Sequence, residues 1–335
     1  RCEHVNVQPL SGSPMNQAVY FAFLQPWDTV LGMDLSHGGH LTHWAPVSHM
    51  WKIFNFVRYK TNPANGGKID FDELMQMVKI YKPKIVLCWY TSYPRDYDYA
   101  DFKKVADEVG AITMADVSHI WGLIAGGVMA NPFDYGFDIV TTTTHKSLRW
   151  PRWWMIMCKQ EFAKAIDKSV FPGLQWWPHM NNIAALAAAL NRAMLPEFKV
   201  YAQTILDNAK ALAAELMKLW VKLITDWTSN HMMVINTVES FGIDWTVAEN
   251  TLEKAWIIVN KQIIPDDPNP PLRPSGIRLW TPAITTRWMQ TQDMSKVAWW
   301  IYKALKNPED EKLLNQIHEE IEIFGKNFSI PSLVD

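Results

Sequence analysis

Two segments carry side chains suited to covalent chemistry on an aldehyde. Asp138–Lys146 reads as a strand that ends in four threonines followed by His145 and Lys146, and Ala111–Asp116 is an apolar strand that ends in a carboxylate. A lysine amine can form a Schiff base, and a carboxylate one sheet position away can keep a pyridinium nitrogen protonated. Lys146 can also be a solvated charge, and Asp116 a helix N-cap with His119 on the same turn. The pair nevertheless predicts a pyridoxal-phosphate site.

Two further segments could contact the same ligand. Ser11–Ser13 is a Ser-Gly-Ser entry into a helix beginning at Pro14, where free backbone N–H groups favour a phosphate, although helix capping alone would explain it. His37, His40 and His43 flank a glycine pair. Three imidazoles without a neighbouring Cys or carboxylate are a poor metal set, so we expect no metal and favour close approach of the backbone to a flat ligand.

An arginine follows a rigid, proline-rich loop late in the chain. The segment 265–274 holds five prolines among its ten residues and cannot form regular structure, so we expect a fixed loop that ends just before Arg278. A guanidinium binds carboxylates with two hydrogen bonds, and a structural salt bridge is an equally frequent use of such a residue.

The elements that position these residues alternate along the chain. Short apolar runs and helix-period segments follow one another, which is typical of a mainly parallel sheet with helices on both faces. The predicted strands are Thr29–Met33, Ile53–Tyr59, Lys84–Tyr90, Ala111–Ala115, Asp138–Thr142 and Met155–Cys158. The predicted helices are Pro14–Leu24, Asp72–Tyr81, Tyr99–Val109 and Gln160–Ser169.

The pattern changes in the last 140 or so residues. A long helical stretch from Asn182 to about Leu219 is broken by Pro196. Beyond it, His231–Val238 and Trp256–Val259 read as strands, and Val297–Leu305 and Lys312–Ile323 as helices. We therefore expect an α/β domain over residues 1–195 and a smaller α+β domain over residues 196–335.

Composition excludes several classes of protein. With 32 basic and 34 acidic residues, the net charge is −2, so no basic surface is available to recruit nucleic acid or anionic membrane. No apolar run is long enough to cross a bilayer. The three cysteines, Cys2, Cys88 and Cys158, lack paired spacing, which favours a reducing, cytoplasmic setting over a disulfide scaffold.

Several motifs resemble the serine hydroxymethyltransferase family, in order and over nearly the whole chain. They are Glu3–Pro9, Ser11–Ser13, Asp28–Asp34, His37–His43, Val140–Lys146 and Ser275–Arg278. The run Thr-Thr-Thr-Thr-His-Lys is highly specific. The resemblance implies a pyridoxal-phosphate-dependent transferase of fold type I that interconverts serine and glycine and passes a one-carbon unit to tetrahydrofolate. It also implies a homodimer or a dimer of dimers.

The resemblance also assigns roles to individual residues. Lys146 would hold the cofactor, Asp116 would pair with its ring nitrogen, and His40 would stack on its ring. The cofactor phosphate would be surrounded by Ser11, Gly12, Ser13 and His145, and Arg152 would lie nearby in the cofactor loop. Thr91 and His119 would lie near the ring hydroxyl. Arg278 would bind the substrate carboxylate, and the folate site would include Leu35, Gly39, Leu41 and Gln262, the last where relatives carry Asn.

Two features depart from the family pattern. The family's N-terminal arm, which supplies a glutamate and tyrosines, is missing; if the molecule begins at Arg1, we expect weaker cofactor binding and no folate-dependent serine turnover. The chain also has 18 tryptophans and only 15 glycines. The family has glycine at every tryptophan position except Trp300, so we hypothesise that UGA codons read as glycine have been translated as tryptophan.

Two alternative functions remain open on the sequence. One is a folate-independent aldolase that cleaves β-hydroxy amino acids such as threonine. The other is a non-catalytic relative that keeps the fold as a scaffold, a reading favoured by the tryptophan pairs Trp153–Trp154 and Trp176–Trp177. Threonine cleavage unaffected by folate would indicate the aldolase, and absence of a cofactor chromophore would indicate the scaffold.

Overall fold

The chain folds into two compact units. The computed structural model describes residues 1–44, 48–89, 91–270 and 272–330. Unit 1 comprises residues 1–61, 69–91 and 97–202, and unit 2 comprises residues 62–68, 92–96 and 203–335. Each unit has its own hydrophobic core. Two short segments, residues 62–68 and 92–96, therefore belong to unit 2, although the chain before and after each belongs to unit 1. The chain finally passes from unit 1 to unit 2 within the long helix Pro196–Lys218.

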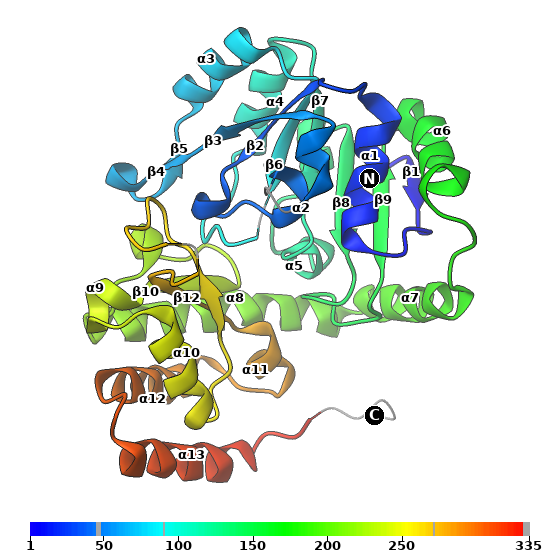
Figure 1. The fold of residues 1–335 in the computed structure, drawn as a ribbon. Helices are drawn as coiled ribbons and strands as arrows, with labels where there is room; N and C mark the ends of the chain where they lie inside the picture. Colours follow the sequence, from blue (N-terminus) through cyan, green and yellow to red (C-terminus); the bar gives the residue numbers. More distant parts are fainter. Residues whose placement is uncertain (45–47, 90, 271, 331–335) are drawn as a thin grey trace. The chain divides into compact units, whose positions relative to one another are not determined.

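Unit 1 is built on a seven-stranded sheet in the order β1-β9-β8-β7-β6-β2-β3 (Figure 1). The five strands from β8 to β3 run parallel, whereas β9 is antiparallel to β8, and β1 is antiparallel to β9. The strands are β1 (His4–Asn6), β2 (Thr29–Met33), β3 (Asn55–Tyr59), β6 (Ile85–Trp89), β7 (Ile112–Asp116), β8 (Ile139–Thr143) and β9 (Trp154–Cys158). The mainly parallel α/β architecture predicted from the sequence is confirmed.

Helices cover both faces of this sheet. Every residue of β6, β8 and β9 is buried, which requires packing on both sides of the strands. Met15 and Val19 share a core cluster with Ile85 of β6, while Phe102 packs its ring against Tyr59. The helices of unit 1 are α1 (Gly12–Phe23), α2 (Leu41–Trp44), α3 (Phe71–Tyr81), α4 (Tyr99–Asp107), α5 (Trp121–Ala125), α6 (Gln160–Lys168) and α7 (Met180–Ala193).

Unit 2 places helices around a small antiparallel sheet. Its strand order is β10-β12-β11, and the helix α8 (Pro196–Lys218) enters it from unit 1. The remaining elements are β10 (Met232–Asn236), α9 (Thr237–Phe241), α10 (Trp245–Lys254), β11 (Asn260–Gln262), β12 (Gly276–Trp280), α11 (Pro282–Thr286), α12 (Met294–Lys306) and α13 (Glu311–Gly325). A short pair, β4 (Thr61–Asn62) and β5 (Lys68–Ile69), stands where the chain first joins this unit. Among the described residues, none of the helices combines the length and apolar character that crossing a bilayer requires.

One predicted element is wrong. Residues 256–259 do not form a strand: Trp256 lies in the turn that ends α10, and the next strand begins at Asn260. Tryptophan, isoleucine and valine have high strand propensities, and therefore the apolar run Trp256–Val259 was predicted as a strand. The strands β1 and β12 were not predicted as such, because β1 is only three residues long and the proline-rich loop obscured the start of β12.

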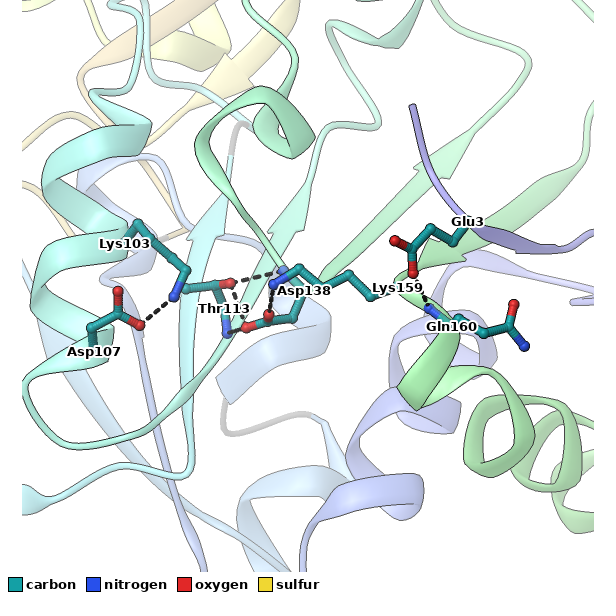
Figure 2. Close-up of polar contacts among 7 residues, drawn as sticks. All are labelled: Glu3, Lys103, Asp107, Thr113, Asp138, Lys159 and Gln160. Carbon is teal, nitrogen blue, oxygen red and sulfur yellow. Dashed lines mark hydrogen bonds and ion pairs between the residues drawn. The ribbon is translucent and has the colours of Figure 1, made fainter.

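The carboxylate of Asp138, just before the amino end of β8, makes hydrogen bonds to β7 and to the residue that follows β9 (Figure 2). Asp138 accepts hydrogen bonds from the Thr113 backbone N–H at 2.9 Å and hydroxyl at 2.7 Å, and from Lys159 Nζ at 2.5 Å. Burial acts to raise the pKa of Asp138, but the hydrogen bonds from Lys159 and Thr113 outweigh it and lower that pKa. Asp138 is therefore a structural anion, at the end of β8 opposite to Lys146.

Candidate active site

A pocket of about 200 Å³ in unit 1 collects most of the residues predicted for the cofactor. It lies where β7 and β8 end and α1 begins, as expected for a parallel sheet. Its lining includes Ser11, Gly12, Ser13, His40, Asp116, His145, Lys146 and Arg152. These residues come from five separate segments of the chain.

Asp116 is the last residue of β7 and is fully buried. Its Oδ2 accepts a hydrogen bond from Asn16 Nδ2 at 2.9 Å, and its Oδ1 accepts from the Ser118 backbone N–H at 3.0 Å and hydroxyl at 2.5 Å. Burial raises the pKa of Asp116, while these hydrogen bonds and the charge of Lys146 act to lower it. The hydrogen bonds to Ser118 form a local turn rather than a helix cap, so the carboxylate belongs to the pocket.

Lys146 and His145 follow β8 directly. Thr143 ends the strand, and its hydroxyl donates to the Ser118 carbonyl at 3.1 Å, which connects the ends of β7 and β8. His145 Nε2 lies 3.4 Å from an Arg152 nitrogen. Burial, together with the charges of Lys146 and Arg152, lowers the pKa of His145 to about 4. His145 is therefore a neutral imidazole at neutral pH, beside two cations.

The Ser-Gly-Ser segment begins α1. Ser11 is the N-cap in extended conformation, and its side chain makes no capping hydrogen bond. The Ser13 hydroxyl lies 2.8 Å from that of Thr42. The Ser11 side chain therefore leaves the first-turn N–H groups uncapped, and Ser11, Gly12 and Ser13 all line the pocket, where a helix N-terminus favours an anion.

Two tryptophans also line the pocket. The ring of Trp89 lies 4.6 Å from that of His40 at an angle of 36°, and its Nε1 donates to the Thr91 hydroxyl. Trp154 packs against the start of α1, because a Cβ placed on Gly12 would lie 3.0 Å from the Trp154 Nε1 atom. One indole thus covers His40 and the other lies on the Gly12 backbone.

Other predicted residues lie outside this lining. His119 is buried, and its carbonyl accepts a hydrogen bond from Ser147 at 2.9 Å. Thr91 accepts a hydrogen bond from the indole of Trp89, which lines the pocket. Gly39 is buried against the carbonyls of Met33 and Asp34, where a Cβ would collide, and Leu35 is half-buried in the preceding turn. The side chain of Leu41 lies outside the described part of the structure.

Arg278 and Gln262 come together in unit 2. Arg278 lies on β12 and donates to the Ser92 hydroxyl at 3.0 Å, and that hydroxyl donates to Gln262 Oε1 at 2.5 Å. Burial lowers the pKa of Arg278 to about 10, so it stays charged at neutral pH. Its guanidinium also lies 4.8 Å from the Trp280 ring. The cluster is a buried positive charge held beside Ser92, Gln262 and the Trp280 ring.

Sequence reasoning missed four contributors to these sites. Asn16 lies one turn into α1, Ser118 lies two residues after Asp116, and Ser92 links Arg278 to Gln262. Trp89 was read as part of a strand and as one of the tryptophans at family glycine positions, and not as a pocket residue. The signal for Asn16 was available, because an amide one turn after a helix entry is an uncommon choice for a buried face. Ser92 gave no such signal.

The polar residues of the pocket fit pyridoxal phosphate. They supply an amine, a buried carboxylate, an imidazole and a helix N-terminus, which are the four groups this cofactor needs. Trp89 and Trp154 do not fit it as well, since each places an indole where ring or phosphate would approach His40 or Gly12.

The parallel sheet, with a lysine and a buried carboxylate in one pocket at its strand ends, defines the class of α/β pyridoxal-phosphate-dependent transferases. The family model of serine hydroxymethyltransferase matches residues 1–301, and the chain belongs to that family. The resemblance seen in the sequence is thereby confirmed. The protein is a transferase that interconverts serine and glycine with transfer of a one-carbon unit, using pyridoxal phosphate and a folate co-substrate.

Proposed function

We propose that Lys146 is the residue that holds pyridoxal phosphate and that Asp116 is the partner of its ring nitrogen. Both side chains line one pocket, and the positive charge of Lys146 stabilises the Asp116 carboxylate. When bound, the cofactor supplies an electron sink for the pair released as a bond at the substrate Cα breaks. This shared pocket is the observation that carries the proposal.

Asp116 would hold a proton between its carboxylate and the ring nitrogen. Its complete burial excludes water from this pair, and hydrogen bonds from Asn16 and Ser118 fix the carboxylate plane. A carboxyl whose pKa is raised by burial shares a proton with a ring nitrogen more evenly than an exposed one does. Asn16 and Ser118 are positioning residues in this scheme.

The phosphate would lie between the start of α1 and the cationic side of the pocket. Ser11, Gly12 and Ser13 supply backbone N–H groups, and Arg152 supplies charge beside the neutral His145. His40 would stack on the cofactor ring, with His119 and Thr91 close to the ring hydroxyl. The phosphate residues and His40 are assigned on the family resemblance together with the pocket lining, and His119 and Thr91 on the resemblance alone.

Substrate recognition falls to other residues. We propose that Arg278 binds the carboxylate of serine or glycine, because it is a buried guanidinium, charged at neutral pH, and oriented in part by a hydrogen bond to the Ser92 hydroxyl. Leu35, Gly39, Leu41 and Gln262 are proposed for the folate co-substrate, on the family resemblance.

The assembly and location complete the proposal. We propose a homodimer or a dimer of dimers in the cytoplasm, on the family resemblance and the absence of paired cysteine spacing. A molar mass in solution equal to that of one chain, measured by light scattering, would refute the oligomer.

Replacement of Lys146 tests the central assignment. Lys146→Ala should abolish the visible absorption of the lysine-bound cofactor and reduce serine cleavage to background. Lys103→Ala is the matched control, since Lys103 pairs with Asp107 on α4, outside the pocket. Retention of the absorption by the Lys146 variant would assign the cofactor to another lysine, whereas loss in both variants would point to a folding defect.

A further inference from the structure

Four tryptophans have a backbone that suits glycine. Trp27, Trp220, Trp256 and Trp288 have φ values of 72°, 61°, 64° and 71°. In the described part of the chain they are four of the nine non-glycine residues in the left-handed region, although tryptophan supplies only 18 of 335 residues. A bulky residue in this region is an outlier, because its Cβ crowds the backbone.

Three of the four end helices with the same hydrogen-bond pattern. After α8, the Trp220 N–H donates to the Met217 carbonyl at 3.0 Å and the next N–H, that of Val221, donates back to Leu216 at 3.1 Å. Trp256 after α10 and Trp288 after α11 repeat this pair of bonds. This is the Schellman motif, whose left-handed C′ position is most often glycine.

Glycine fills that position after two other helices of this chain. Gly110 (φ 65°) follows α4, with its N–H donating to Asp107 and the next N–H to Ala106. Gly127 (φ 71°) follows α5 with the same two bonds. The five helix ends are therefore alike in backbone and hydrogen bonding, and differ only in whether the C′ residue is glycine or tryptophan.

Trp27 occupies the equivalent position of a turn. The Asp28 N–H donates to the Gln25 carbonyl at 3.0 Å, with Pro26 second and the left-handed Trp27 third. Proline followed by a left-handed residue is the type II pattern, and its third residue is normally glycine.

The four indoles gain little from packing. Trp27, Trp220, Trp256 and Trp288 are 72%, 93%, 56% and 65% exposed. Trp300 is the contrast: it lies within α12, is 3% exposed, donates to Glu320 at 2.8 Å and packs edge-on against Phe324. Burial of Trp300 gives a reason for an indole there. The other four indoles are mostly exposed, and Trp256 gains only a stacking contact with the His318 ring at 4.2 Å.

Two buried tryptophans conflict with the cofactor pocket instead. Trp89 and Trp154 line it, one against His40 and one on the Gly12 backbone. Glycine at positions 89 and 154 would open the pocket beside His40 and beside Gly12, and would leave the polar residues of the lining unchanged.

We propose that the native polypeptide carries glycine at positions 27, 89, 154, 220, 256 and 288, encoded by UGA codons that its cell reads as glycine. The four left-handed positions carry this inference independently of the proposed cofactor site. Position 300 is excluded from it and keeps its tryptophan.

The gene and the native protein test the proposal directly. We expect UGA at the six codons and UGG at codon 300, and peptide masses from protein purified from the source cells that correspond to glycine at the six positions and tryptophan at 300. UGG at the six codons, or peptides with the mass of tryptophan there, would overturn it.

Stability of recombinant protein gives a second test that does not depend on activity. Relative to the chain as written, glycine at 27, 220, 256 and 288 should raise the thermal midpoint by roughly 2–4 °C per site, since left-handed strain is relieved. Trp300→Gly should lower it. A fall or no change with the four glycines would contradict the backbone argument.

Cofactor retention tests the two pocket positions. Chains with glycine at 89 and 154 should retain more pyridoxal phosphate after gel filtration than the same chain with tryptophan there, measured as bound phosphorus per chain. Equal retention would show that the indoles do not obstruct the pocket and would remove positions 89 and 154 from the proposal.

Discussion

Asn16 is the residue that connects the start of α1 to the strand ends. Its Nδ2 donates to Asp116 at 2.9 Å, and its Oδ1 accepts from the Thr141 hydroxyl at 2.8 Å. The Asp116 carboxylate fixes which way the amide faces, because an ionised carboxylate only accepts and requires the NH2 group; the Thr141 hydroxyl then donates to the amide oxygen. Asn16 thus acts with Ser118 on the position and the proton affinity of the buried carboxylate.

Asn16→Ala should shift the acid limb of the activity profile. Loss of a hydrogen bond to the ionised form raises the pKa of Asp116 further. Activity should therefore be lost at a higher pH as the solution is acidified. The measurement is kcat for serine cleavage against pH.

Thr141→Val is the matched control for this prediction. It removes the hydrogen bond to Asn16 Oδ1 and keeps the one from Nδ2 to Asp116, so its shift should be smaller. If Asn16→Ala lowers stability and leaves the pH profile in place, Asn16 does not act through Asp116.

His145 makes stability depend on pH. Its pKa is lowered to about 4 in the folded chain, chiefly by burial, against about 6.5 for an unperturbed histidine. Between those values the unfolded chain binds a proton that folded His145 does not. The stabilisation is complete above about pH 6.5 and is lost as pH falls toward about 4.

His145→Gln should reduce this loss. Urea midpoints of the variant should fall less than those of the parent between about pH 7 and pH 5, because the titrating imidazole is gone. An equal fall in both proteins would assign the acid sensitivity to other groups. Buried His43, whose pKa is also well below the usual value, contributes with the same sign and is present in both proteins.

At the scale of elements, the two ends of β8 have different tasks. The carboxyl end delivers Thr143, His145 and Lys146 to the pocket, and Asp138 at the amino end joins β7 and the chain after β9 (Figure 2). Substitution of Asp138 at the amino end of β8 should therefore lower the stability of the fold without changing the reaction in the pocket.

Asp138→Ala should lower the free energy of unfolding by about 2–4 kcal/mol, because it leaves Thr113 and Lys159 without their acceptor. Asp107→Ala, which removes the i,i+4 partner of Lys103 on α4, should cost only about 0.2–1 kcal/mol. Urea unfolding at neutral pH measures both. Equal effects of the two variants would show that Asp138 is no more than another surface ion pair.

The strands were the elements best predicted from the sequence. β2 matches its prediction residue for residue, and β6, β7, β8 and β9 differ from theirs by one or two residues at either end. Buried parallel strands are continuous apolar runs, so local sequence is enough to find them. The error at 256–259 came from counting Trp256 as a strand former where the backbone makes a helix-ending turn.

At the scale of the whole molecule, the chain crosses between its two units more than once. Residues 92–96 belong to unit 2, although they follow β6 of unit 1 almost directly. This excursion brings Ser92 to Arg278 and Gln262, which lie some 170–186 residues further along the chain. No local pattern reports such a pairing, because its partners meet only through the fold of unit 2.

The sequence by itself determined the fold class and the family, and it predicted that Lys146 and Asp116 share one site, since these depend on strand patterns and on a highly specific run of residues. The tertiary structure decided what surrounds that pair: the Asn16 and Ser118 hydrogen bonds, the neutral state of His145 and the two indoles in the pocket. It also decided which tryptophans have a left-handed backbone. Burial, hydrogen-bond partners and φ arise from contacts between distant segments, which residue types and spacing do not specify.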